Sequence, residues 1–93
     1  MIHDFRCHET KGIWEGKISR KFPSTIQELA RRKLRMLQNA KVVRDLLIPP
    51  GNRLESLKGK RKGQYNIRIN DQWRICFRWN EGHVYGVEII DYH

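Results

Sequence analysis

Apolar and polar residues alternate through the last third of the chain, with the period of a β-strand that has one buried face. The apolar set is Tyr65, Ile67, Ile69, Trp73, Ile75, Phe77 and Trp79. The polar set between them is Asn66, Arg68, Asn70, Arg74, Cys76 and Arg78. The pattern predicts strands at about 64–70, 73–79 and 84–91, joined by hairpin-like turns. We therefore expect an antiparallel meander with a core on one face and an open, cationic surface on the other.

The last predicted strand is expected to continue both faces. Strict alternation puts Tyr85, Val87, Ile89 and Asp91 on one side and Val84, Gly86, Glu88, Ile90 and Tyr92 on the other. With the aliphatic pair Val87 and Ile89 in the core, Tyr92 shares the face of Arg74. Asp91 and His93 then point away from that face, unless the strand frays or twists at its end.

Helical spacing dominates the segment before these strands. Its apolar stripe is Ile26, Leu29, Ala30, Lys33, Leu34 and Leu37, with the aliphatic stem of Lys33 at the edge. The pattern predicts an amphipathic helix from Ser24 to about Asn39. Ser24 is followed three residues later by Gln27, which resembles a capping box.

Shorter elements are expected around this helix. Residues 2–7 read as a short edge strand, residues 10–17 as one or two helical turns anchored by Trp14, and residues 41–47 as a second short helix. The prolines and glycine at 49–51 turn the chain, and Leu54 and Leu57 then join the core. The sequence predicts one α+β domain over residues 1–93, with the helices and the N-terminal strand on one face of a small antiparallel sheet.

The charge balance indicates a polyanionic partner. The chain of 93 residues has 19 Lys and Arg against 10 Asp and Glu, a formal net charge of +9 and a sequence pI of about 10.1. The excess is uneven, because residues 53–78 hold eight Lys or Arg against only Glu55 and Asp71. Nucleic acid is therefore the favoured partner class.

Several other classes are disfavoured. No apolar run approaches a membrane-spanning length, and the N-terminus lacks a signal-peptide layout, so we expect a cytoplasmic protein without membrane contact. Cys7 and Cys76 stand alone without a metal-ligand spacing and are expected to pack in or near the core. No Walker loop is present. We expect neither a metal nor another cofactor.

The chain nevertheless carries groups that suit RNA cleavage without a metal, in which the 2′-hydroxyl attacks the adjacent phosphate. His93 can carry protons at neutral pH, Arg74 and Lys58 supply fixed charge, Tyr92 offers a hydroxyl and Glu55 is a possible base. Further RNA contacts are expected from Lys60, Arg61, Lys62, Arg68 and Arg78. Plainer roles are a solvated His93, an ion pair between Arg74 and Glu88, and a surface salt bridge for Glu55. From these residues alone, nucleic-acid binding is favoured over cleavage.

Three stretches resemble HigB-type toxins of the RelE superfamily. They are Pro-Pro-Gly-Asn-Arg-Leu-Glu-Ser-Leu-Lys-Gly at 49–59, Ile-Arg-Ile-Asn-Asp-Gln-Trp-Arg-Ile-Cys-Phe at 67–77, and Val-Glu-Ile-Ile-Asp-Tyr-His at 87–93. The resemblance implies the RelE-like fold and the toxin of a type II toxin–antitoxin pair, which cleaves messenger RNA in the ribosomal A site. It also implies a HigA-type helix-turn-helix antitoxin as partner, with operator DNA reached only through that antitoxin.

The resemblance also assigns roles to individual residues. Arg74 matches the phosphate-binding arginine of the family, and Lys58 matches its lysine in Leu-Lys-Gly. The catalytic C-terminus of the family corresponds to Asp91, Tyr92 and His93. Where some members have a histidine before Leu-Lys-Gly, this chain has Glu55, whose carboxylate either takes over the role of the base or leaves it to His93.

Two alternatives to this interpretation remain. The chain could be a non-catalytic basic module that binds RNA or the ribosome and inhibits translation by occupancy. It could also be a ParE-like relative that poisons gyrase, which would share the fold. The combination of a terminal Tyr-His with a sheet arginine is not typical of that class, so this alternative ranks last.

Overall fold

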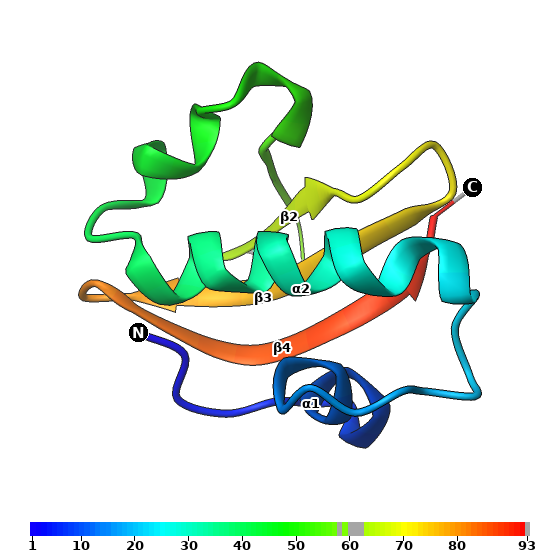
Figure 1. Cartoon of the computed structure of the whole chain (residues 1–93). Coiled ribbons are helices and arrows are strands. Elements are labelled where there is room, and N and C mark those ends of the chain that lie inside the picture. Colours follow the sequence, from blue (N-terminus) through cyan, green and yellow to red (C-terminus); the bar gives the residue numbers. More distant parts are fainter. Residues whose placement is uncertain (58, 60–62, 93) are drawn as a thin grey trace.

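The fold has two layers, helices and a sheet. The computed structural model describes residues 1–57, 59 and 63–92. Four antiparallel strands, in the order β1-β2-β3-β4, form one sheet, and two α-helices pack against one of its faces (Figure 1). This confirms the predicted α+β class with helices on one side.

The strands are β1 (Glu55–Ser56), β2 (Gln64–Arg68), β3 (Trp73–Asn80) and β4 (His83–Asp91). The three predicted strands are therefore present, with the first ending two residues earlier than expected. The sequence did not predict β1, because two residues are too few to show an alternation. Its pairing of Glu55 with Asn66 adds a fourth strand beside β2 and brings Glu55 to the sheet.

The N-terminal segment lies along β4 but does not form the regular strand predicted for residues 2–7. It makes two isolated parallel bridges, between Ile2 and Val84 and between Phe5 and Val87. The amide of Arg6 donates to the carbonyl of Val87 at 2.9 Å. The outer edge of the sheet is thus partly covered by a segment that pairs only intermittently.

The first helix, α1 (His8–Trp14), begins two residues before the predicted turns and ends three residues before their end. Trp14 was expected to anchor it, but the fully buried residues are Thr10 and Ile13, and Trp14 is half-buried. The Thr10 hydroxyl accepts a hydrogen bond from the amide of Ile89 at 3.0 Å, which fixes α1 to β4.

The second helix, α2 (Ser24–Asn39), has the predicted bounds, but the predicted capping box is wrong. Pro23 is the N-cap, and no side chain caps the helix. The Gln27 side chain instead accepts from the amide of Ser19 at 3.0 Å and donates to its carbonyl at 2.8 Å. Gln27 therefore holds the loop before the helix, because its side chain satisfies backbone groups of Ser19 and Phe22.

After α2 the predicted helix at 41–47 is a shorter 3₁₀-helix, η1 (Val43–Leu47), which is followed by η2 (Pro50–Asn52). Only Leu46 of η1 is buried. Asn52 is also buried, where it accepts a hydrogen bond from the Lys33 ammonium and donates to the Leu46 carbonyl at 3.1 Å. Lys33 thus has a specific buried partner, and its pKa is lowered first by burial and then by the nearby charge of Arg68.

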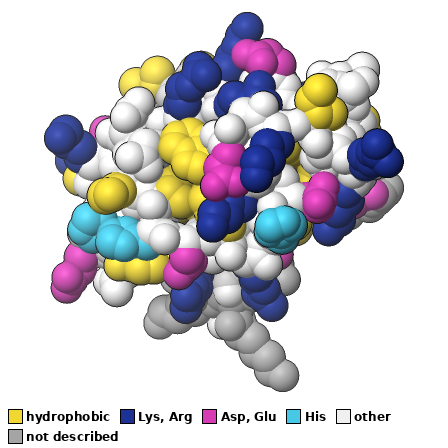
Figure 2. Space-filling view, turned by 60° about the horizontal axis from the view of Figure 1, so that its bottom comes forward, with side chains coloured by type: hydrophobic (Ala, Val, Ile, Leu, Met, Phe, Trp, Pro, Cys, Tyr) yellow, Lys and Arg dark blue, Asp and Glu magenta, His cyan; other side chains and the backbone are white. Residues whose placement is uncertain are grey.

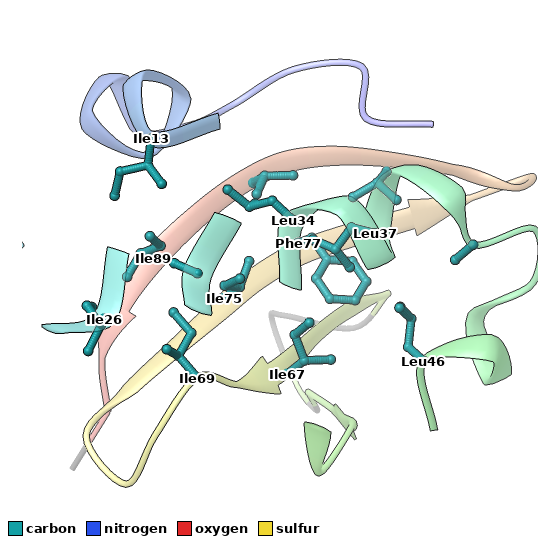
Figure 3. Packing of buried hydrophobic residues seen from close by; sticks show 14 of the residues in the cluster. Ile13, Ile26, Leu34, Leu37, Leu46, Ile67, Ile69, Ile75, Phe77 and Ile89 are labelled. Atoms are coloured by element: carbon teal, nitrogen blue, oxygen red, sulfur yellow. The ribbon is translucent and has the colours of Figure 1, made fainter. Parts of the chain in front are cut away.

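The core lies between the sheet and the helices. Side chains from both helices, from η1 and from β2, β3 and β4 meet there (Figure 3). The labelled members are Ile13, Ile26, Leu34, Leu37, Leu46, Ile67, Ile69, Ile75, Phe77 and Ile89. Leu29, predicted for the stripe, is exposed instead. In the part of the chain that the structure describes, no helix is long and apolar enough to cross a membrane.

A β-bulge corrects the predicted faces of the last strand. Cys76 pairs with Glu88, but Arg78 pairs with Tyr85, so β4 contains one extra residue between these pairs. Gly86, at this point, has a φ of 60°, a left-handed conformation that glycine adopts without steric cost. As a consequence Val84 and Val87 are both in the core. The prediction had placed them on opposite sides, because alternation alone cannot reveal a bulge.

Candidate functional site

Arg74 is the centre of the site. It lies on β3, in register with Arg68 of β2 and Ile90 of β4, on the face away from the helices. Its Nη1 donates to the side-chain oxygen of Asn66 and, at 3.1 Å, to the backbone carbonyl of Arg53. With its side chain only 9% exposed, the guanidinium is held in one orientation before any ligand arrives.

Glu55 supplies the negative charge. Its Oε1 lies 3.3 Å from Nη2 of Arg74, and its Oε2 accepts a hydrogen bond from the Tyr92 hydroxyl at 3.3 Å. The carboxylate therefore bridges the cation and the phenol. The plainer expectation for the sheet arginine, a pair with Glu88, is wrong, because Glu88 lies 3.9 Å from Nε of Arg6 instead.

Tyr92 completes the cluster from the end of the last strand. Its ring centroid lies 4.8 Å from Cζ of Arg74, a cation–π distance. Its backbone amide donates to the carbonyl of Gln72 at 2.6 Å, which fixes the chain end to the turn before β3. Residues from β1, β3 and the end of β4 thus meet, although up to 37 positions separate them.

Asp91 is not part of this cluster. It pairs with Trp73 and so shares the side of Trp73 and not that of Arg74. Its Oδ2 accepts a hydrogen bond from Nε2 of Gln72 at 3.3 Å. This is the arrangement that strict alternation predicted at the strand end.

The other sheet arginines differ from Arg74. Arg68 forms an ion pair with Asp71 at 2.6 Å, and this hydrogen bond, followed by the charge of Arg68, lowers the pKa of Asp71. Arg78 is exposed and lines a cavity of about 490 Å³. Of the predicted site residues, Lys58, Lys60, Arg61, Lys62 and His93 lie outside the described residues.

The sequence analysis missed Asn66 and the backbone carbonyl of Arg53. Asn66 is fully buried although it lies on the face that was expected to be open. Its side-chain oxygen binds Arg74, while its amide nitrogen has no hydrogen-bond partner in the described part of the chain. The register offered a signal, because a residue diagonal to Arg74 on the neighbouring strand lies within side-chain reach. No pattern in the sequence indicated that the backbone carbonyl of Arg53 would bind Arg74.

The charge is mixed on the face of the molecule that Figure 2 shows. Figure 2 shows Lys and Arg side chains spread among Asp and Glu around an apolar area, without one continuous basic patch on that face. Within residues 1–57, 59 and 63–92, no three His, Cys, Asp or Glu side chains gather in a way that could hold a metal ion. The described cluster therefore offers a fixed guanidinium group, with a carboxylate and a phenol hydroxyl beside it.

Solved structures place this fold in a known class. The chain resembles YafQ from E. coli with a TM-score of 0.65 at 9% identity, covering 98% of this chain and 91% of that one. It resembles the YoeB dimer from Staphylococcus aureus with a TM-score of 0.59 at 16% identity, covering 100% and 93%. At these identities the likeness shows the fold alone, which is that of the RelE-like toxins.

Sequence comparison gives the family within that class. Residues 4–93 match the profile of the RelE-like toxin of type II toxin-antitoxin system HigB, and the chain belongs to this family. It is 46% identical over 68 residues to Toxin HigB-1 of Vibrio cholerae, covering 73% of this chain and 72% of that protein. It is 28% identical over 97 residues to Endoribonuclease HigB of Proteus vulgaris, covering both chains completely. The predicted family is thereby confirmed, and membership of a type II system implies an antitoxin partner.

Proposed function

We propose that this toxin is a metal-independent endoribonuclease that cuts messenger RNA in the ribosomal A site and so inhibits translation. The observation that carries the proposal is the Arg74 guanidinium, held by Asn66 and Arg53 with Glu55 and Tyr92 against it. A rigid cation of this kind stabilises the negative charge that develops on a phosphorane. The name of the Proteus vulgaris relative, an endoribonuclease, supports the same reaction class.

In the proposed reaction the phosphate replaces Glu55 on Arg74. Glu55 Oε1 now occupies a place beside Nη2 that suits a phosphate oxygen equally well, since both are anionic acceptors. The displaced carboxylate, or His93, accepts the proton of the 2′-hydroxyl, whose oxygen forms a bond to phosphorus. The bond from phosphorus to the 5′-oxygen breaks, and Tyr92 or His93 protonates that oxygen. The products are a 2′,3′-cyclic phosphate and a 5′-hydroxyl.

The remaining predicted roles belong to the same proposal. Lys58 adds fixed charge near the phosphate, and Asp91 belongs to the C-terminal element of the family. The described cluster has few proton-transfer groups, so alignment of the RNA by the ribosome is expected to supply much of the rate enhancement. The antitoxin is proposed to be of the HigA helix-turn-helix type, and operator DNA is reached only through it.

The test is cleavage of a defined message on programmed ribosomes. Wild type should produce cuts with cyclic-phosphate ends, and a 2′-deoxy substitution at the scissile nucleotide should abolish them. Arg74→Ala should lower the rate constant about 10²- to 10³-fold, because it removes a preorganised charge. Deletion of His93 should lower it as well.

Arg35→Ala is the matched control, because it removes one positive charge from an exposed position on α2. It should leave the rate constant nearly unchanged. Translation that stops while the message stays intact would contradict cleavage and support the occupancy alternative. In that case Arg74→Ala should weaken ribosome binding and its salt dependence together.

A further inference from the structure

A second feature of the open face lies beyond the Arg74 cluster. A cavity of about 490 Å³ crosses the sheet, with Gln64 of β2, Arg78 of β3 and Gly86 of β4 on its lining. The N-terminal segment closes it with Asp4, Phe5 and Arg6. This volume is within the usual range of small-ligand sites.

Two arginines line this cavity: Arg6, whose Nε lies 3.9 Å from a carboxylate oxygen of Glu88, and Arg78, which has no such partner among the described residues. Arg68 and Arg74 each bind a carboxylate, at Asp71 and Glu55. Arg78, by contrast, makes no side-chain hydrogen bond or ion pair within the described ranges. It lies four residues beyond Arg74 on the same face of β3, or roughly 13 Å along the strand. It also lines a neighbouring cavity of about 430 Å³ with Tyr85.

The acidic and amide groups of the cavity argue for the kind of ligand. One oxygen of Asp4 accepts a hydrogen bond from the amide of Gly86, which fixes the carboxylate at the cavity wall. Its other oxygen accepts no hydrogen bond from the residues that the structure describes, so it can accept one from a ligand. A fixed carboxylate repels a phosphate, but it suits an exocyclic amine, and the Gln64 amide both donates and accepts. A guanidinium plane also provides a stacking surface for a nucleobase.

The β-bulge at Gly86 lies beneath the Arg78 side chain. A Cβ added at Gly86 would lie 3.8 Å from Nε of Arg78. This is an ordinary van der Waals distance, which shows that the Arg78 side chain lies over the strand at Gly86. The left-handed φ of Gly86, 60°, and the hydrogen bond from its amide to Asp4 tie the bulge to the same cavity.

We infer that this cavity binds one base of the RNA strand that passes over Arg74, a base that flanks the scissile linkage and carries an exocyclic amine. The base stacks on the Arg78 guanidinium and presents its amine to Asp4 and its other polar edge to Gln64. Uracil, which has no exocyclic amine, is disfavoured there. This inference rests on the proposed function for the identity of the strand, and it adds a source of sequence preference to it.

The test uses RNA octamers with 2′-O-methyl groups, which lack the nucleophile and cannot be cut. Fluorescence anisotropy measures their affinity while each position in turn is made abasic or uracil. One position is expected at which the abasic change weakens wild-type binding about five- to 150-fold, the value of one stacked base. Uracil at the same position should weaken binding less, because it still stacks and loses only the amine contact to Asp4. In Arg78→Ala the intact octamer should show this loss, and the abasic change at that position should add little.

Asp4→Asn gives the sharper result. An asparagine oxygen can still accept from Gly86, while its amide can donate to the O4 of uracil. Uracil at the critical position should then bind as well as or better than the amine-bearing bases. Unchanged thermal unfolding midpoints would show that both variants keep the fold.

Arg35→Ala is again the control for loss of charge, and it should weaken all octamers equally and only slightly. A scan with no base-dependent position overturns the inference, as does an Arg78→Ala variant that behaves like Arg35→Ala. If wild type does not cut on ribosomes but the Arg78-dependent position is found, the proposed function fails and the base site stands. If it cuts and the scan is flat, the base site alone fails.

Discussion

Arg74 and Arg78 lie on the same face of β3, four residues apart, but their surroundings are opposite. Arg74 is buried, with Asn66, Arg53 and Glu55 on its nitrogens and the Tyr92 ring beside it. Arg78 is exposed above a glycine and lines two cavities. The alternation that places both is the same, so the difference comes from what the rest of the chain puts around each of them.

The two arginines therefore suit different tasks, one the stabilisation of a transition state and the other the binding of a ligand. An arginine whose orientation is fixed in advance can stabilise a transition state without further reorganisation, and Arg74 has that property. An arginine without a fixed partner can adapt its orientation to a ligand, and Arg78 has this freedom. The first depends on its guanidinium geometry, whereas the second depends mainly on charge and stacking area.

Replacing each arginine by lysine should give the largest contrast. Arg74→Lys keeps the charge but cannot reach Asn66, Arg53 and Glu55 together, so the buried oxygen of Asn66 or the partly buried carbonyl of Arg53 loses its donor. The free energy of unfolding should fall by about 1–3 kcal/mol, and the cleavage rate constant about 10²-fold. Arg78→Lys should leave the free energy of unfolding and the maximal cleavage rate constant nearly unchanged, but it should weaken binding of the RNA octamers, because an ammonium group has no plane on which a base can stack. Chemical denaturation and the ribosome assay measure the first two quantities.

Equal effects of the two lysine variants on the cleavage rate would contradict the distinction. A large loss at Arg78 with little loss at Arg74 would reverse it, and the catalytic cation would then be sought at the cavity.

Asn66→Ala should have an intermediate effect. Asn66 contacts Arg74 and not the substrate, so it is a positioning residue whose loss frees the guanidinium to move. We expect the maximal cleavage rate to fall about tenfold while the apparent affinity for ribosomes changes little. Asn39→Ala, which removes an exposed amide at the end of α2, is the matched variant and should leave both the maximal rate and the affinity unchanged. If Asn66→Ala weakens affinity without slowing the maximal rate, its role is binding and not positioning.

The sequence predicted the parts of this arrangement that depend on local periodicity. Alternation placed Tyr92 on the side of Arg74 and Asp91 on the opposite one, and the structure has both there. It could not show that Glu55 would reach Arg74, because β1 has two residues and its pairing with β2 is a tertiary contact. The capping box failed for a related reason, since Gln27 finds better-placed backbone partners in the preceding loop.

Arg68 is intermediate between the two cases, and it gives the smallest expected effect. It is ion-paired with Asp71, but Asp71 is fully exposed. Asp71→Asn should release Arg68 into a state like that of Arg78. The affinity for single-stranded RNA should rise slightly, and the slope of log affinity against log salt should steepen by about 0.7, the value of one additional phosphate contact.

The pH dependence of stability checks the same pair independently. The folded state holds the pKa of Asp71 below its ordinary value of 3.8, so the pair stabilises the fold above pH 3.8. This contribution is lost as the pH falls through the lowered pKa, where wild type and Asp71→Asn should become equally stable. The difference should be small at neutral pH, because the carboxylate is in water. A difference that persists or grows in acid would show that Arg68 is held by something other than Asp71, and Arg68 would then belong with Arg74.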